Sequence, residues 1–579
     1  MLLATPVNAA EFVVNDPGLL GDLNEGDGVC ETGNGTCTLI AAIAETRASA
    51  GPHTITIAVP GPIGFPGGIL PDDLTLRSSE DVDVILRGGD LRVGERSSIG
   101  DTSPSSGFRI EGNIFIWGED SAVRNNIIVR NDDPVEQGFG IVEVMDGSPS
   151  NAEQRRADRA ILENNVFFNT GKNISVIQVK TNDAVIQGNV IGFDEDGNVA
   201  PGDSGIAYGI LALSSQRLTI SENLIYGYGV GLVVSELENS MIDNNLIGNV
   251  KGIADAGATG SGPVLGNGIV SANGFGNNFR GNISNGHALN GIALLSSTDA
   301  VLVDNEFSDN GNAGIVTDAE STGYRFELNR LVNNGGLAID VLNDGIINNA
   351  VDDGLPNPPS IVVTGENGIQ RFEGTFSDPE FVDDFATVCF SASTSCPGAV
   401  SGESDSEFPL FCQDAVLDTA SGEFLISAAI APDEIVPAGR FITATVTTSA
   451  GTSELSECAE VPELVVVEPL EFYPVNAWVL NPRSAKSLLG VFLGSEVNDV
   501  TTVEIDSLRL GEASGSVVSM PDFNEDGYTD LMVRFRGRDT GAECGDTVLV
   551  LTGEHAFGAF ERELDLRTVG CSGKGKGKD

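Results

Sequence analysis

The feature of this 579-residue chain that most restricts its fold is an internal repeat in which an asparagine precedes a short apolar run. The repeat recurs at Asn126, Asn165, Asn189, Asn223, Asn245, Asn282, Asn305 and Asn329, with steps of 39, 24, 34, 22, 37, 23 and 24 residues. A second mark, Gly followed by Ile or Leu, recurs at Gly209, Gly231, Gly268, Gly291, Gly314 and Gly336, with steps of 22, 37, 23, 23 and 22. Both marks give one period near 22 to 24 residues, and the longer steps indicate inserted loops.

This period predicts an all-β chain built around a parallel β-helix, whose coils each hold two or three short strands and bury apolar side chains against the next coil. Asparagine suits the bend before a strand because it tolerates left-handed backbone and its amide can bond an equivalent Asn one coil away. The repeat asparagines are therefore predicted to be structural. A leucine-rich repeat is the main alternative, but the sequence lacks its Leu spacing and its helical segments.

Composition shifts divide the chain into parts. Apolar residues at helical spacing over 37–47 predict a short helix that covers the open end of the coil stack, and a proline-rich stretch at 354–359 marks a domain boundary. The predicted parts are a signal-peptide remnant at 1–10, an N-terminal cap at 11–52, a β-helix at 53–353, an immunoglobulin-like β-sandwich at 360–464, a small β-rich module at 466–572 and a disordered tail at 573–579.

The chain carries a formal net charge of −53, which opposes binding to nucleic acid or to an anionic membrane surface and favours divalent cations as partners. Val7-Asn8-Ala9 has the small-residue pattern of a signal-peptidase site. We therefore expect an exported protein whose mature chain begins near Ala10 or Glu11. No later run approaches the roughly 18 apolar residues that a membrane span needs. The sequence does not indicate an oligomeric state.

The cysteines form an even set that divides by region into groups of two, four and two. They are Cys30, Cys37, Cys389, Cys396, Cys412, Cys458, Cys544 and Cys571. No Cys-x-x-Cys occurs and the chain has 3 histidines, so a zinc site would lack its usual ligand spacing. We expect disulfides closed within domains. The four central cysteines allow three pairings, among which the sequence does not choose.

The segment from Gly26 to Leu39, followed by a predicted helix, resembles the N-terminal region of bacterial CSLREA-domain proteins, which are exported chains with a right-handed, pectin-lyase-like β-helix. This chain has C-T-L-I-A-A where the family name spells C-S-L-R-E-A. The stretches at 191–197 and 337–345 are similar to an insertion and to the last coil of such proteins. The resemblance implies fold and a secreted or cell-surface location, but no catalytic residues.

A local motif at 522–530 predicts a calcium site. Oxygen ligands at alternate positions, a Gly at the sixth place and a backbone carbonyl at the seventh suit calcium. The segment resembles the loop of FG-GAP and related calcium-binding β-modules, which implies side-chain ligands from Asp522, Asn524, Asp526 and Asp530 and a carbonyl ligand from Tyr528. A plain acidic hairpin turn is the alternative. A shorter acidic turn with Asp194, Asp196 and Asn198 is interpreted as solvated.

Two functional hypotheses remain open. The first is a non-catalytic exported β-helix that presents a lateral surface to polysaccharides or surface proteins. The second is a polysaccharide lyase, hydrolase or epimerase with a site on the lateral face, which is an analogy at the level of fold. No lyase or epimerase base motif occurs in the sequence, and Asp243, Asp304, Asp309 and Asp340 are interpreted as turn formers. Core packing is the expected role of Trp117 and Trp478.

Overall fold

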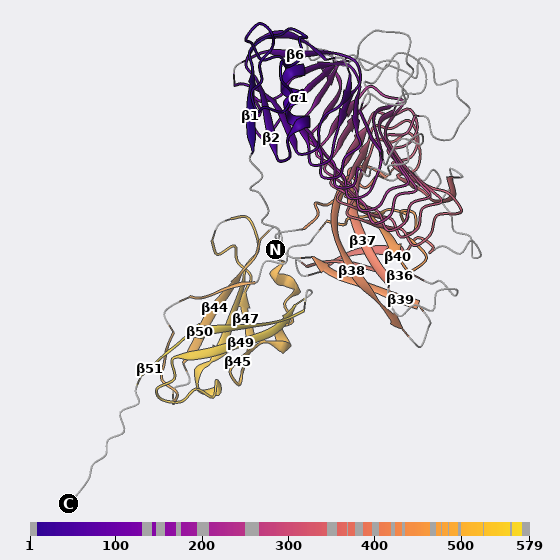
Figure 1. Cartoon of the computed structure of the whole chain (residues 1–579). Coiled ribbons are helices and arrows are strands. Elements are labelled where there is room, and N and C mark those ends of the chain that lie inside the picture. The colour runs from indigo at the N-terminus through magenta and orange to yellow at the C-terminus, as the bar shows by residue number, and fades with distance from the viewer. Residues whose placement is uncertain are drawn as a thin grey trace, which may run out of the picture. The chain divides into compact units, whose positions relative to one another are not determined.

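The computed structural model describes residues 9–65, 67–80, 82–129, 142–145, 157–168, 175–193, 208–248, 266–343, 356–366, 369–376, 386–396, 405–418, 423–430, 435–463, 470–475, 478–483, 486–495, 499–524, 526–555 and 558–569. Within these ranges the protein is almost wholly β-structure. Three long parallel sheets form a right-handed β-helix, as predicted, and antiparallel sheets follow it in the chain (Figure 1).

Each coil contributes one strand to each parallel sheet, so that every third strand in the sequence belongs to the same sheet. The first sheet contains β1 (Ala10–Val14), β2 (His53–Ile57), β5 (Leu74–Ser78), β8 (Ser98–Ile99), β11 (Ala122–Arg124), β14 (Ile161–Glu163), β17 (Val185–Gln187), β20 (Thr219–Ser221), β23 (Met241–Asp243), β26 (Asn278–Arg280), β29 (Val301–Val303) and β32 (Arg325–Glu327). The second contains β3 (Gly61–Phe65), β6 (Val84–Gly88), β9 (Arg109–Glu111), β12 (Ile127–Val129), β15 (Val166–Phe168), β18 (Val190–Phe193), β21 (Leu224–Tyr226), β24 (Leu246–Gly248), β27 (Ile283–Asn285), β30 (Glu306–Ser308) and β33 (Arg330–Val332). The third contains β4 (Gly68–Ile69), β7 (Leu91–Val93), β10 (Ile114–Ile116), β13 (Val142–Met145), β16 (Ser175–Lys180), β19 (Tyr208–Leu213), β22 (Val230–Ser235), β25 (Ile269–Ala272), β28 (Ile292–Leu295), β31 (Ile315–Thr317) and β34 (Ile339–Asp340).

Side chains alternate between the interior of the coils and the outer surface, as strand geometry requires. In β10, Ile114 and Ile116 are fully buried in the continuous apolar core, whereas Phe115 between them faces outward. Aliphatic side chains fill most of the interior, and Phe279 and Phe307 are among its largest members. Because one coil cannot bury these groups alone, stacking of the coils stabilises the fold.

The eight repeat asparagines form a buried ladder along the corner between the first and second sheets, which confirms their structural role. At one rung, Asn223 donates from its backbone N and its Nδ2 to Oδ1 of Asn245, at 3.1 and 2.9 Å. Asn245 in turn donates from Nδ2 to the Ile220 carbonyl at 2.8 Å. The left-handed backbone falls on the residue before each rung, for example Asn244 with a φ of 53°.

The second repeated mark, the glycine, reflects close packing at another corner. A Cβ added at Gly231 would lie 2.2 Å from Cγ2 of Ile247, and one at Gly291 would lie 2.7 Å from Cβ of Phe307. Any side chain there would overlap the core side chains of the second sheet. The glycine mark does not extend to the last coil. Ile315 pairs with Ile339, so the residue that follows Gly314 in this row is Ala338 and not the predicted Gly336.

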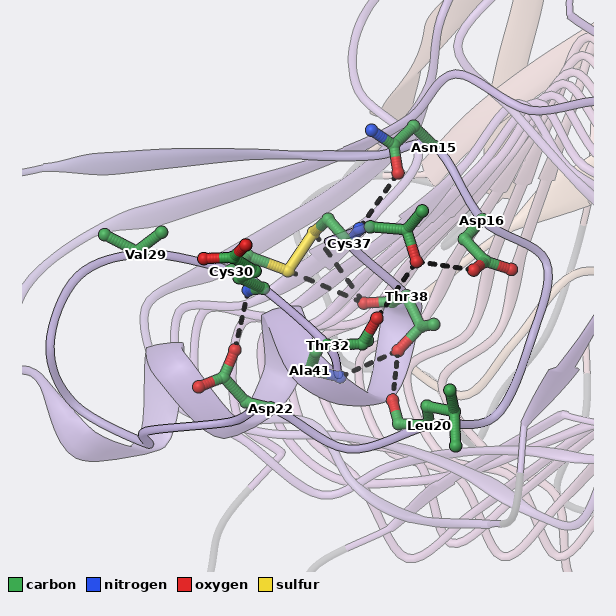
Figure 2. The surroundings of a disulfide bond; sticks show 12 residues. Asn15, Asp16, Leu20, Asp22, Val29, Cys30, Thr32, Cys37, Thr38 and Ala41 are labelled. Atoms are coloured by element: carbon green, nitrogen blue, oxygen red, sulfur yellow. Dashed lines mark hydrogen bonds between the residues drawn. A yellow bond between two sulfur atoms is a disulfide. The ribbon is translucent and has the colours of Figure 1, made fainter. Parts of the chain in front are cut away.

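Helix α1 (Leu39–Ala48) packs against β1, β2 and β3, as predicted, and buries Leu39 and Ile43 in the core of the coils (Figure 1). Thr38 caps the helix by accepting a hydrogen bond from Ala41 N at 3.2 Å. The Cys30–Cys37 disulfide closes the loop that leads into this cap (Figure 2). The helix therefore covers one end of the coil stack.

The loop before α1 is fixed to the first coil by hydrogen bonds. Cys37 N donates to Asn15 Oδ1 at 2.9 Å (Figure 2). Asn15 N donates in turn to the Cys37 carbonyl at 3.0 Å. The carboxylate of Glu45, buried on α1, accepts from Gly26 N and Gly28 N at 2.7 and 2.8 Å. These contacts join loop, helix and coil into one cap.

Segments that follow the coils in the chain satisfy the backbone groups of the last coil. Leu331 and Ser406 exchange two backbone hydrogen bonds at 2.9 Å each. Phe326 N donates to Oγ1 of Thr452 at 3.0 Å, and Val341 N donates to Oε1 of the buried Glu454 at 2.9 Å. Unpaired strand edges invite association with other chains, so these contacts act as a second cap.

These segments belong to a seven-stranded sheet with the order β35-β36-β39-β38-β37-β40-β41. Its strands are β35 (Ser360–Glu366), β36 (Ile369–Phe376), β37 (Ala386–Ser393), β38 (Phe408–Asp418), β39 (Glu423–Ile430), β40 (Phe441–Thr447) and β41 (Ala459–Glu460). By its internal contacts the chain divides into two compact units, one of residues 1–362, 373–428 and 439–461, the other of 363–372, 429–438 and 462–579.

The C-terminal sheets have an apolar core of their own, which includes Phe472, Trp478, Phe492 and Phe535. Their strands are β42 (Glu471–Pro474), β43 (Val479–Leu480), β44 (Ser487–Leu493), β45 (Arg509–Leu510), β46 (Ala513–Ser514), β47 (Ser516–Ser519), β48 (Leu531–Arg536), β49 (Val548–His555), β50 (Gly558–Asp565) and β51 (Arg567–Thr568). Short 3-10 turns lie at Val341–Asn343, Val500–Thr502, Ile505–Ser507 and Gly537–Asp539. Among the described residues no helix has the length and apolar character that crossing a membrane requires.

Candidate functional site

Strand register places one outward-facing residue from each coil of the third sheet in a single row, which we call the lateral column. From β7 to β34 it consists of Arg92, Phe115, Glu143, Gln178, Leu211, Val233, Val270, Ala293, Val316 and Asp340. The residues on either side of each member in sequence point into the core, so the column lies on the outer face of the sheet.

The first coils of the column carry a cationic and aromatic group. The Arg92 guanidinium carbon lies 4.9 Å from the centre of the Trp117 ring, and Nη2 of Arg92 lies 3.5 Å from Oδ2 of Asp90. The rings of Phe115 and Trp117 are 5.9 Å apart and tilted by 57°. A guanidinium held over an indole is a cation–π contact, which fixes both side chains on the surface.

The next two coils place buried polar side chains in the same row. Glu143 and Gln178 are paired in register, and their residues are 6% and 9% exposed. Oε1 of Gln178 is buried and has no hydrogen-bond partner among the described residues. Burying an acceptor without a donor costs roughly 1 to 3 kcal/mol, which makes this oxygen a candidate ligand contact. Lys180 follows two residues later and is exposed.

From β19 to β31 the column is apolar, and it ends at the buried Asp340 of β34. Val233, Val270, Ala293 and Val316 are all buried, and Leu295 packs against both of the small clusters that they form. The chemistry that the lateral column offers is therefore concentrated in its first four coils. There, Glu143 has Phe115 and Gln178 as its register neighbours, so within these coils no second carboxylate adjoins it in the row.

Two carboxyl groups about 5 to 9.5 Å apart are the usual arrangement of a glycoside hydrolase. A single carboxylate beside an amide, an arginine and aromatic rings instead suits recognition of hydroxyl groups, since the amide and the carboxylate accept hydrogen bonds and the guanidinium donates them. The described part of the column thus offers binding chemistry more readily than acid–base chemistry by a carboxylate pair.

The predicted calcium ligands lie in the loop before β48. Asp522 accepts from Asp526 N at 3.1 Å and from Gly527 N at 3.0 Å. Asp526 accepts from Tyr528 N at 2.9 Å and from Nδ2 of Asn524 at 2.7 Å. Gly527 has a φ of 93°, which explains the glycine at the sixth place.

Asp530 differs from the other predicted calcium ligands because it is fully buried. Its carboxylate accepts from Gly494 N at 2.8 Å and from Phe523 N at 2.5 Å, and so ties the loop to the end of β44. The oxygen donors of the loop fit calcium in kind. In the described chain, however, no three His, Cys, Asp or Glu side chains gather closely enough to hold a metal ion.

Three disulfides lie within two of the predicted cysteine groups, one in the N-terminal pair and two among the central four. The pairs are Cys30–Cys37, Cys389–Cys412 and Cys396–Cys458, which selects one of the three pairings open to the central four. Cys544 is also disulfide-bonded, and Cys571 lies outside the described residues. Disulfides of this kind are typical of proteins that fold in oxidising compartments.

The acidic turn predicted at Asp194, Asp196 and Asn198 lies outside the described residues. Of the aspartates that were interpreted as turn formers, Asp304 and Asp309 occupy left-handed turns, with φ values of 56° each. The other two were predicted wrongly, because Asp243 and Asp340 lie on strands.

Trp478 is buried in a core, as expected, but the same expectation for Trp117 was wrong, since it is half-buried on the outer face. The alternation of Ile114, Phe115, Ile116 and Trp117 is the signal that could have revealed this. The remainder of the lateral column carries no comparable mark, because loops of unequal length separate its members in the sequence.

Comparison with models of known protein families supports the fold. A family model described as a right handed beta helix region matches residues 198–353. No curated protein matches the chain. Among solved structures, a mutant of the periplasmic alginate epimerase AlgG is 19% identical, with a TM-score of 0.32, and the match covers 51% of this chain and 69% of that one.

Two further solved structures come from other kinds of protein. The Dettilon tailspike protein gp208 is 10% identical with a TM-score of 0.30, and the match covers 70% of this chain and 87% of that one. PfbA, a surface adhesin of Streptococcus pneumoniae, is 12% identical with a TM-score of 0.29, and the match covers 63% and 98%. Similarities at this level assign no function to the chain.

Proposed function

We propose that this chain is an exported, non-catalytic β-helix protein that binds a glycan or a surface protein along its lateral column. The observation that carries the proposal is the row formed by Arg92, Phe115, Glu143 and Gln178 on adjacent coils, flanked by Trp117. Aromatic rings with a few fixed polar groups are the usual composition of a recognition surface.

Export is supported by the disulfides and by the N-terminal cap. The loop closed by Cys30–Cys37 leads directly into α1, in the segment that resembles the CSLREA-domain proteins. We infer a location outside the cell or at its surface, where oxidised cysteines persist. The contacts of Glu454 and Ser406 with the last coil cap the β-helix at its other end.

We propose that the loop at 522–530 binds calcium and that the surrounding C-terminal sheets are an FG-GAP-like module. Asp522, Asn524 and Asp526 would supply exposed side-chain oxygens and Tyr528 its carbonyl. Asp530 would act mainly as the anchor that holds the loop against Gly494. Bound calcium would neutralise the carboxylates and draw the loop together, which is a stabilising role.

A polysaccharide lyase, hydrolase or epimerase remains the second candidate because of one observation, the buried carboxylate of Glu143 on the outer face. A carboxylate beside a sugar could abstract a proton as a general base. The two candidates differ in whether a bound polymer is chemically changed.

The test applies the purified chain to immobilised neutral and acidic polysaccharides and assays the same polymers for new reducing ends and unsaturated products, with calcium and with chelator. We expect retention on at least one polymer, weakened by Trp117→Ala, without product. Release of product by the wild-type chain but not by Glu143→Gln would establish the enzyme instead. A folded chain that is retained on none of the polymers would count against glycan binding.

A further inference from the structure

The residues of the lateral column also indicate which class of ligand it takes. We infer that the ligand is an uncharged, hydroxyl-rich glycan chain that lies along the helix axis across β7, β10, β13 and β16. This inference rests on the proposed function, because it names the ligand of the same surface.

The charge of the chain favours an uncharged ligand. Among the described residues, the first four coils of the column offer the cations Arg92 and Lys180 and the carboxylates Asp90 and Glu143, so these side chains form no positive patch. The whole chain carries a formal net charge of −53. A field of this sign repels a polyanion at low salt, over a Debye length of about 10 Å at 0.1 M. A neutral polymer pays no such penalty.

The unpartnered polar atoms of the column favour a ligand rich in hydroxyl groups. Oε1 of Gln178 is a buried acceptor without a partner, and Nε of Arg92 is a buried donor without a partner, among the described residues. A carboxylate on the ligand could satisfy only the donor, because an ionised carboxylate has no proton to give. A hydroxyl group both donates and accepts, so a polyol can satisfy both atoms.

The length of the column favours an extended chain as the ligand. Arg92 and Gln178 lie on strands three steps apart in the sheet, which corresponds to roughly 14 Å at about 4.8 Å per step. A single small molecule would not span this distance, whereas an extended chain would. Trp117 and Phe115 lie at one end of the span and offer apolar faces to the C–H groups of a sugar ring.

The test uses a matched pair of polymers, polygalacturonate and its fully methyl-esterified form, together with a neutral glucan. These share hydroxyl groups, but only the first is charged. Binding to the full chain is measured by titration at 50 and 500 mM NaCl. We expect a neutral polymer to bind at least about 10-fold more tightly than polygalacturonate at low salt, and the difference to shrink at high salt as screening increases.

The variants separate the column from the rest of the surface. Gln178→Met removes the unpartnered acceptor at nearly constant volume, and we expect about 5- to 10-fold weaker binding. Gln187→Met is the matched control, because Gln187 lies on the outer face of the first sheet, in β17. Trp117→Ala is compared with Phe275→Ala, which removes a ring that is 48% exposed and lies outside the column.

A readout on the unmodified chain covers the case in which a variant does not fold. The chain has 2 tryptophans, and Trp478 is buried, so acrylamide quenching of fluorescence reports mainly on Trp117. A neutral polymer should protect Trp117 from the quencher, and polygalacturonate at the same concentration should not.

The outcomes distinguish this inference from the proposed function. Equal binding of polygalacturonate and its ester at 50 mM NaCl, or binding that Gln178→Met leaves unchanged, would overturn the inference and leave glycan binding standing. Failure of every polymer to bind or to protect Trp117 in the folded chain would remove the proposed glycan function itself.

Discussion

Arg159 and Asp120 form a two-bond ion pair between consecutive coils, with Nε 2.7 Å from Oδ1 and Nη2 2.9 Å from Oδ2. The same geometry joins Arg96 to Asp73 and Arg217 to Asp183. All six residues have positive φ. At the corner before the first sheet, successive coils therefore place an aspartate and an arginine in turn, each with left-handed backbone. Each arginine bonds the aspartate of the preceding coil.

These pairs predict a small, charge-specific contribution to stability. Hydrogen bonds from the guanidinium groups lower the pKa of Asp73, Asp120 and Asp183, so this stabilisation is present above the ordinary carboxyl pKa and is lost as pH falls through the lowered values. Because the side chains are partly exposed, Asp183→Asn should lower Tm by no more than about 2 °C at low salt.

A charge swap tests the pairing itself. Asp183→Arg alone places like charges together beside Arg217 and should lower Tm further than Asp183→Asn, whereas adding Arg217→Asp should recover part of the loss. Thermal melts at 20 mM and 500 mM NaCl measure this, because screening weakens exposed pairs. Equal Tm values for the single and the swapped variants would show that the pair contributes nothing.

The asparagine ladder predicts a much larger effect. Asn245→Ala would leave Asn223 N without its partner and would remove the hydrogen bonds that the Asn245 amide donates to the Ile220 carbonyl and to Asn282. Each buried unsatisfied group costs roughly 1 to 3 kcal/mol, so we expect a loss of about 3 kcal/mol or more in the free energy of unfolding. Urea denaturation followed by circular dichroism measures it.

The residue before the rung provides the control. Asn244 has a positive φ, and a glycine, Gly281, occupies the same position in the next coil. Asn244→Gly should therefore change the free energy of unfolding by less than about 1 kcal/mol. If both substitutions were equally harmful, the corner backbone and not the amide ladder would set the stability of the coil.

Features of the fold that depend on local or periodic sequence could be predicted, whereas features that depend on contacts between distant residues could not. The coils could be predicted because Asn245 and Gly231 repeat with the period of the fold, and α1 because its own residues carry the helical pattern. The second cap could not, since Glu454 meets Val341 across 113 residues of chain with no local mark. The lateral column escaped prediction for a related reason, because its members meet only once the register across unequal loops is known.

Calcium binding at 522–530 predicts a stabilising shift confined to the C-terminal sheets. At a free calcium concentration 100 times its Kd, the ion would add about 2.7 kcal/mol to the free energy of unfolding. Differential scanning calorimetry of the full chain, with calcium and with chelator, measures the shift. Asp522→Asn should abolish the shift, while Asp506→Asn, at an exposed acidic residue before β45, should retain it. A shift that survives Asp522→Asn would place the ion elsewhere.

His287 predicts how the coils respond to acid. Its ring lies inside the stack, with Nε2 3.4 Å from the Ile247 carbonyl, and its backbone N donates to Oδ1 of Asn310 at 3.1 Å. Burial lowers the pKa of His287 to about 4 from the ordinary 6.5. The unfolded chain therefore takes up a proton below pH 6.5 while the folded chain does not, so stability falls between pH 6.5 and about 4.

The expected loss is about 3 kcal/mol over that interval, at 1.36 kcal/mol for each pH unit. His287→Asn should remove this part of the acid sensitivity and keep the rung, because Asn310 and Asn334 occupy the same place in later coils and donate from Nδ2 to the Ser284 and Phe307 carbonyls. Urea unfolding at pH 7.5, 5.5 and 4.5 compares the variant with wild type and with His555→Asn, at the partly exposed histidine of β49. Parallel pH profiles for all three chains would show that the buried ring does not govern the acid response, whereas a flatter profile for His287→Asn alone would assign the response to that ring.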